Sequence, residues 1–78
     1  MPTVLRKGSY RFFFYASDRN EPCHIHVERD EMIAKFWLCP VRISSSSSFS
    51  RVELNRIHKM IEENEELFVE AWNEYFEC

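Results

Sequence analysis

The sequence predicts a small α+β fold, an antiparallel sheet of three to four strands with a C-terminal helical segment packed on one face. Apolar and polar residues alternate in the first half, as in strands, whereas the last third repeats apolar residues at helical spacing. A chain of 78 residues is one small domain. We expect a single domain 1–78, with the sheet in 3–43, a flexible serine connector in 44–48 and a helical part in 50–77.

The strand signals differ in strength along the first half. Aromatic residues dominate 10–15, and the only glycine, Gly8, lies between this stretch and a short β-prone segment, which predicts a hairpin. Turn-forming residues precede Pro22, and Pro40 ends a later strand. The five serines after Ile43 are typical of an unordered connector. The expected strands are 3–6, 10–15, 23–28 and 32–38, with 41–43 as a short extra candidate.

The stretch around the two adjacent histidines organises the sheet. In a strand, His24, His26 and Glu28 point to one face, and Ile25 and Val27 point to the other. The apolar pair belongs under the helices, so the histidines belong on the opposite face.

Extending this register predicts a face rich in rings and cations, which would be a binding surface if it is open. A homodimer contact or a loop folded over this face is the alternative. We call these residues the histidine face: Arg11, Phe13, Tyr15, His24, His26, Glu28, Lys35 and Trp37.

The helical part begins at a clear signal. Ser50 and Glu53 form the S-x-x-E pattern of a capping box, and Phe49 with Leu54 fits a hydrophobic staple. A polar stretch interrupts the apolar stripe at Asn64, where we expect either a kink in one helix or a break into two.

Charge and cysteine content exclude several classes. Residues 1–50 carry seven lysines and arginines against five acidic residues, and residues 51–78 carry three against eight. This balance does not favour nucleic-acid binding, although a local basic patch stays open. No apolar run approaches the roughly 18 residues that span a membrane. Three scattered cysteines and no expected signal peptide predict free thiols in the cytoplasm.

Two kinds of chemistry are open to the histidine pair. Alternate strand residues place two imidazoles at chelating distance, so His24 and His26 are weak metal candidates, with Glu28 or His58 as a further ligand. The same pair could be acid and base for RNA cleavage, with Lys35 steadying the phosphate. Hydrogen-bonded histidines without either role are more common. We therefore expect no cofactor, and binding rather than catalysis.

Several stretches together resemble a family of small bacterial proteins described as a domain of unknown function. They are YRFFFY (10–15), HIHV (24–27) and AWNEYF (71–76), and the likeness covers nearly the whole chain. Members are often encoded beside a second small protein, an arrangement similar to toxin–antitoxin pairs, and the resemblance implies no catalytic residues. This chain departs from the family in Cys23, where a second proline is common, and in its serine run.

The expected function is therefore that of a binding component in a two-protein, toxin–antitoxin-like module, using the histidine face. The expected partner is a small protein encoded nearby, and a homo-oligomer is also open. The alternative is a small ribonuclease-like toxin or a metal-binding protein that uses His24 and His26.

Overall fold

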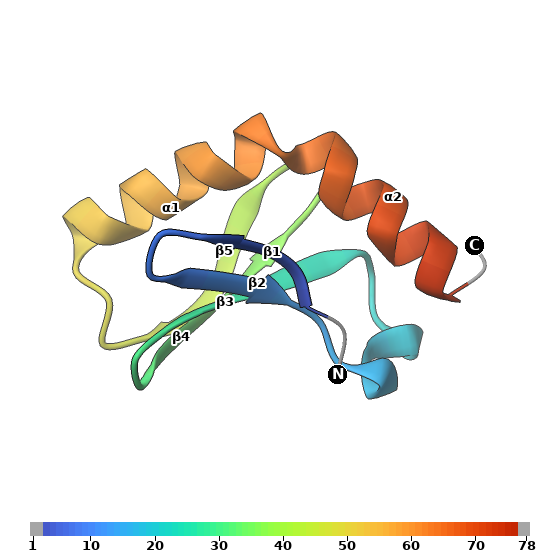
Figure 1. The fold of residues 1–78 in the computed structure, drawn as a ribbon, viewed down its shortest axis with the longest axis horizontal. Helices are drawn as coiled ribbons and strands as arrows, with labels where there is room; N and C mark the ends of the chain where they lie inside the picture. The colour runs from blue at the N-terminus through green and yellow to red at the C-terminus, as the bar shows by residue number, and fades with distance from the viewer. Residues whose placement is uncertain (1–2, 77–78) are drawn as a thin grey trace.

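The computed structural model describes residues 3–76, which form a five-stranded antiparallel sheet and two helices (Figure 1). Residue 77, the end of the expected helical part, lies outside this range. The sheet follows chain order and the helices come last. The elements are β1 (Thr3–Lys7), β2 (Tyr10–Phe13), the 3-10 helix η1 (Ala16–Asn20), β3 (His24–Arg29), β4 (Met32–Trp37), β5 (Arg42–Ser47), α1 (Arg51–Glu63) and α2 (Glu65–Phe76).

The α+β class is confirmed, but the expected three to four strands are five. The additional strand is β5, which contains most of the serine run that we had expected to be a flexible connector. Ser45, Ser46 and Ser47 pair with successive residues of β4, and the register shifts at Lys35/Phe36. Serine has a low β propensity, but pairing with β4 satisfies backbone groups of both strands and overrides it.

Two tight turns set the hairpins. Gly8 has φ +60° in the β1–β2 turn, the left-handed region that glycine adopts without strain. Asp30, with φ +56°, turns β3 into β4. Phe12 then lies opposite Val27, and Phe13 lies opposite His26.

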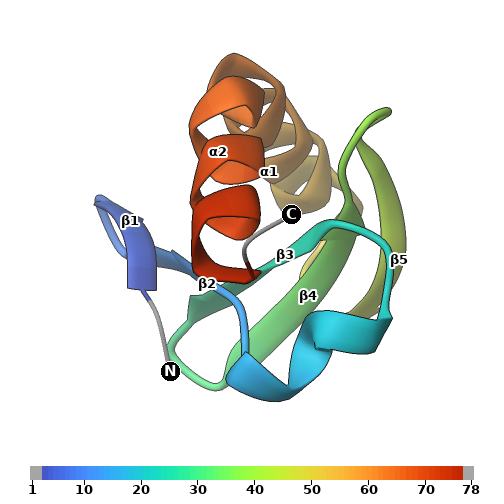
Figure 2. The same ribbon diagram turned by 90° about the vertical axis from the view of Figure 1, so that its right-hand side faces the viewer.

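One face of the sheet is the core, and the helices arch over it (Figures 1 and 2). The predicted inward register is therefore correct. The buried residues of this layer are Phe12, Phe14, Ile25, Val27, Ala34, Phe36 and Leu38 from the sheet side, with Phe49, Ile57, Ile61, Phe68, Trp72 and Phe76 from the helical side.

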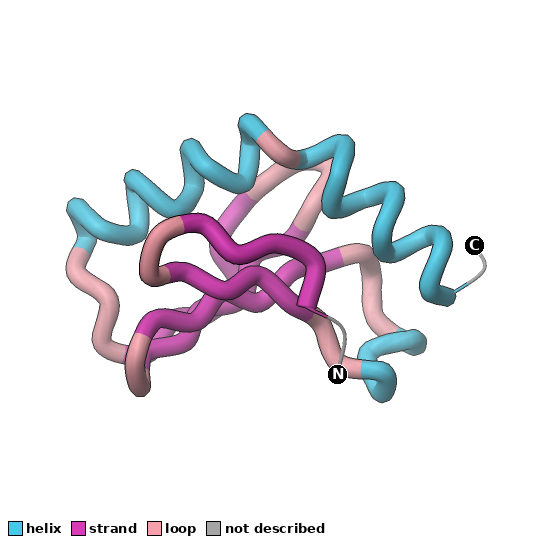
Figure 3. The backbone as a smooth tube through the Cα atoms, in the orientation of Figure 1, coloured by secondary structure: helices cyan, strands magenta, loops and turns pink. Residues whose placement is uncertain are grey.

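The helical part consists of two helices, interrupted where the polar stretch predicted (Figure 3). The Ser50 hydroxyl accepts the Glu53 N–H at 3.1 Å, as an N-cap does. The Glu53 carboxylate does not complete a capping box, because it binds Arg29 and Tyr10 instead. The side-chain amide of Asn64 donates to the carbonyl oxygen of Met60 at 2.8 Å and closes α1. Neither described helix is both long and apolar enough to cross a membrane.

The side chains of the histidine face are mostly buried or half-buried, so this face is not the open binding surface that the sequence predicted. Phe13 is 1% exposed and His24 is 0% exposed. Phe13 packs against Tyr15 and His26. His24 is covered by Asp18 of η1, which folds over this side of the sheet (Figure 2), and its ring centroid lies 4.8 Å from that of Trp72 in α2. The alternative of a covering loop is thus what the structure shows. Of the eight residues predicted for this face, Phe13 and His24 are buried, Tyr15 is exposed and the other five are half-buried.

Candidate functional site

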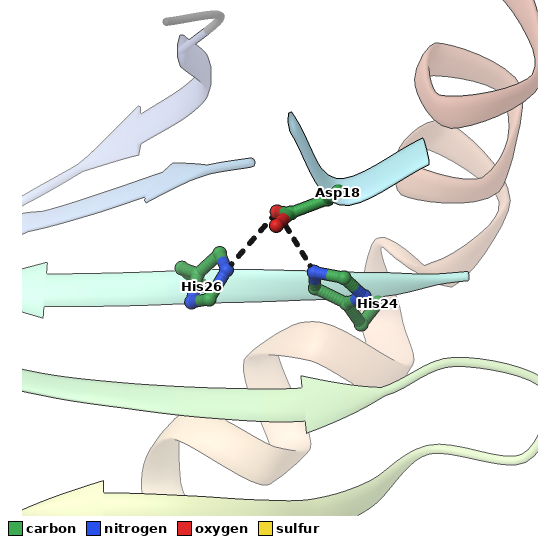
Figure 4. Close-up of side chains that lie close together, drawn as sticks. All are labelled: Asp18, His24 and His26. Atoms are coloured by element: carbon green, nitrogen blue, oxygen red, sulfur yellow. Dashed lines mark hydrogen bonds and ion pairs between the residues drawn. The ribbon is translucent and has the colours of Figure 1, made fainter. Parts of the chain in front are cut away.

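The site is built where η1 crosses the start of β3. The Asp18 carboxylate accepts the backbone N–H of Tyr15 at 2.9 Å, and two backbone hydrogen bonds close the turn on either side of it. Pro22 then extends the chain into β3. The turn therefore holds the Asp18 side chain over the two histidines of β3 (Figure 4).

One oxygen atom of Asp18 connects both histidines. Asp18 Oδ2 lies 2.9 Å from Nε2 of His24 and 3.2 Å from Nε2 of His26. Ligand atoms of the three side chains all lie within 4.8 Å of one another. We call these three residues the Asp-His-His cluster. Among the described residues it is the one group of three or more histidines, cysteines and carboxylates with that spacing.

The buried ring of His24 is held at both nitrogens. Its Nδ1 lies 2.9 Å from the carbonyl oxygen of Pro22, and Nε2 faces Asp18. A carbonyl oxygen only accepts, so Nδ1 carries a hydrogen. Nε2 faces the Asp18 carboxylate at 2.9 Å, so the two contacts together fix the orientation of the buried ring. The ring has no exposed surface, so His24 is not positioned to touch a substrate as the acid or base of RNA cleavage.

His26 is the accessible member of the cluster, with 12% of its side chain exposed. It stacks on Phe13 with centroids 5.4 Å apart and meets the edge of Tyr15 at 4.9 Å. Burial lowers the pKa of the His26 imidazole, and the neighbouring His24 lowers it further. The Asp18 carboxylate raises this pKa but does not cancel the other two effects. His26 therefore favours its neutral form, in which one ring nitrogen offers a lone pair.

Burial by itself would raise the pKa of Asp18, but hydrogen bonds from Tyr15 and His24 outweigh it, and the pKa lies below its ordinary value. The carboxylate is thus ionised at neutral pH. A fixed anion with two imidazoles is a donor set that holds a proton network or a first-row divalent metal ion.

The remaining cations of the histidine face are paired. Arg11 binds Glu28 at 2.9 Å and lies over the ring of Phe13. Lys35 forms an ion pair with Glu21 and lies over the Trp37 ring, 4.6 Å from its centroid. The face therefore offers little free positive charge to a nucleic acid.

The structure brings together only part of the predicted metal set. His24 and His26 meet, but Glu28 turns to Arg11 and is not in the cluster. His58 lies on α1 against Phe36, under the other face of the sheet, and approaches Glu62 at 3.5 Å. We missed Asp18, because a loop aspartate six residues before His24 has no periodic relation to a strand. The available signal was that the turn leading into the histidine strand carries two acidic residues, Asp18 and Glu21.

A known family model matches most of the chain. The family model described as "Domain of unknown function (DUF4160)" matches residues 9–73, so the chain belongs to this family. No curated protein matches the chain, and no solved structure matches it.

Proposed function

We propose that this DUF4160 protein is a binding module that takes up an extended segment of a partner protein as an added strand beside β5. The observation that supports this proposal is the exposure of β5, which is one of the two edge strands of the sheet. Within the described chain β5 pairs only with β4, and all six of its residues are exposed. Backbone groups along such an edge are free to pair with another chain.

The surroundings of β5 suit alternating side chains of an added strand. Two hollows line the strand: one of about 280 Å³ includes Phe36, Ile43 and Leu54, and the other, of about 260 Å³, includes His26 and Lys35. Ile43 pairs with Phe36 of the core face, whereas Ser45 pairs with Lys35 of the histidine face. The two hollows are therefore on opposite faces of the sheet.

This arrangement defines the partner segment. Successive residues of a strand point to opposite faces, so one set of side chains would lie beside Ile43 and the other beside Lys35. The exposed isoleucine favours apolar side chains in the first set. The exposed ring of Tyr15 favours aromatic side chains in the second.

The partner that we propose is the small protein encoded nearby, as the family resemblance implies, in a toxin–antitoxin-like pair. The accessible part of the histidine face, around Tyr15, His26 and Lys35, would then contribute one wall of the interface. A ribonuclease role for the histidine pair is weaker, because His24 is buried and Lys35 is already paired with Glu21.

Co-purification with the neighbouring protein, followed by amide hydrogen exchange, tests the proposal. We expect a stable complex in which the β5 amides gain protection, since their outward groups would become hydrogen-bonded. Ile43→Lys places a charge on the edge beside the first hollow and should abolish binding while the protein stays folded.

The matched control is Val52→Lys, which makes the same aliphatic-to-lysine change on the surface of α1, where Val52 is 69% exposed. It should leave binding unchanged. Equal binding by both variants, or protection confined to β1 or the helices, would contradict strand addition at β5. Self-association of the protein alone, lost in Ile43→Lys, would assign the edge to a second copy instead of the neighbour.

A further inference from the structure

We propose that the Asp-His-His cluster is a divalent metal site, in which Asp18 Oδ2, His24 Nε2 and His26 Nε2 bind a zinc-class ion. This inference is independent of the β5 edge. It starts from the convergence of three ligand atoms that the contacts above describe.

The spacing of the three atoms fits a metal centre. Zinc binds histidine nitrogen and carboxylate oxygen at about 2.0–2.2 Å, so tetrahedral ligand atoms lie roughly 3.3 Å apart. The oxygen of Asp18 is 2.9 Å and 3.2 Å from the two imidazole nitrogens. All three ligand atoms lie within 4.8 Å of one another, so an ion placed among them would draw the two imidazoles together and replace these contacts with bonds.

The groups behind the ligands are already in the arrangement that metal sites use. A metal-binding histidine usually donates its second ring N–H to a carbonyl or carboxylate, which fixes the ring and the coordinating nitrogen. Pro22 supplies that carbonyl to Nδ1 of His24. The N–H of Tyr15 donates to the Oδ2 atom of Asp18 itself and so fixes the orientation of the carboxylate. Both supports come from the short segment that leads into β3.

The donor set also selects the kind of ion. Two imidazoles and one carboxylate suit Zn²⁺ and its first-row neighbours, whereas Mg²⁺ and Ca²⁺ prefer oxygen ligands throughout. Three protein ligands leave at least one coordination position for water or another small ligand. Of the three side chains, those of His26 and Asp18 retain some exposure, at 12% and 10%, which gives the ion a route from solvent.

Zinc titration of untagged, chelator-treated protein tests the site. We expect one zinc per chain by calorimetry, and coordination at Nε2 of both histidines by ring-nitrogen NMR. Cobalt should give a spectrum without a thiolate band, which separates this site from the exposed thiol of Cys39. Asp18→Asn and His26→Gln keep the size of the side chain and should each weaken zinc binding at least about tenfold.

His58→Gln is the matched control, because it removes a histidine on the opposite side of the sheet and should leave the affinity unchanged. Folding of each variant is checked by circular dichroism. If wild-type protein and the His26→Gln variant bind zinc equally, or if no stoichiometric binding occurs with both histidine rings unperturbed in the NMR spectrum, the site is not a metal centre. The cluster is then a hydrogen-bond network that holds η1 on the sheet.

Discussion

The guanidinium of Arg29, at the end of β3, donates two hydrogen bonds of 2.6 and 2.8 Å to the carboxylate of Glu53 in the first turn of α1. Tyr10 donates a third, at 2.7 Å. Paired hydrogen bonds between arginine and a carboxylate fix orientation as well as distance. This contact ties the start of the helical layer to the sheet at a point 24 residues away in the chain.

The Arg29–Glu53 pair should make stability depend on pH. Hydrogen bonding by Arg29, then by Tyr10, lowers the pKa of Glu53 below its ordinary value of 4.5. A lowered pKa means stability that is present above the ordinary value and is lost as the pH falls through the folded-state pKa. Urea unfolding should show wild type more stable than Glu53→Gln at pH 7, with the difference shrinking below pH 4.5. Glu70→Gln makes the same change at an exposed position of α2 and should leave the stability at pH 7 close to that of wild type.

Ser50→Ala should cost roughly 1 kcal/mol of unfolding free energy, because it removes the side-chain oxygen that accepts the N–H of Glu53. Chemical denaturation measures the change. Ser46→Ala removes the same hydroxyl from the exposed strand β5 and should be close to neutral. Equal losses would mean that the cap contributes no more than any surface serine.

Phe13→Ala should destabilise the protein by about 3–5 kcal/mol, the usual cost of truncating a buried phenylalanine, and so nearly unfold a domain of this size. Phe13 lies on the face away from the helices, yet it is 1% exposed. Tyr15→Ala, at a 37% exposed position two residues on, should cost much less. Thermal melting distinguishes the two, and a mild Phe13→Ala variant would show that this face is not closed around Phe13 in solution.

Gly8→Ala should destabilise by about 1 kcal/mol through the backbone alone. The position has φ +60°, and an added Cβ would meet nothing within 4 Å. Gly8→Asn should be milder, since asparagine tolerates the left-handed region better. A comparison of melting temperatures checks the order, and an alanine variant as stable as wild type would argue against this turn geometry.

The sequence predicted what depends on periodicity and on local hydrogen bonds. Alternation in β3 placed Ile25 in the core and His26 on the other side, the cap placed the start of α1, and the polar stretch placed the break at Asn64. Two features were not predicted: the strand formed by the serine run, and the position of Asp18 beside the histidines. Ser45–Ser47 form a strand because they pair with β4. The local propensity of serine does not predict pairing with a distant strand.

The Asp-His-His cluster was not predicted for a related reason. His24 and His26 were identified by their spacing, but Asp18 joins them only because η1 folds back over β3. The same fold-back covers one side of His24, and Trp72 of α2 packs against its ring. Alternation tells which face a strand residue occupies, but not whether a loop covers that face.

The interruption between α1 and α2 at Asn64 also limits the longest dimension of the molecule. A continuous helix through residues 51–76 would be about 39 Å long at 1.5 Å per residue. The longest extent of the molecule is 34 Å. A straight helix would therefore overhang the sheet and leave apolar side chains at one end without a surface beneath them. Because the chain bends there, each helix follows its own part of the twisted sheet (Figure 1).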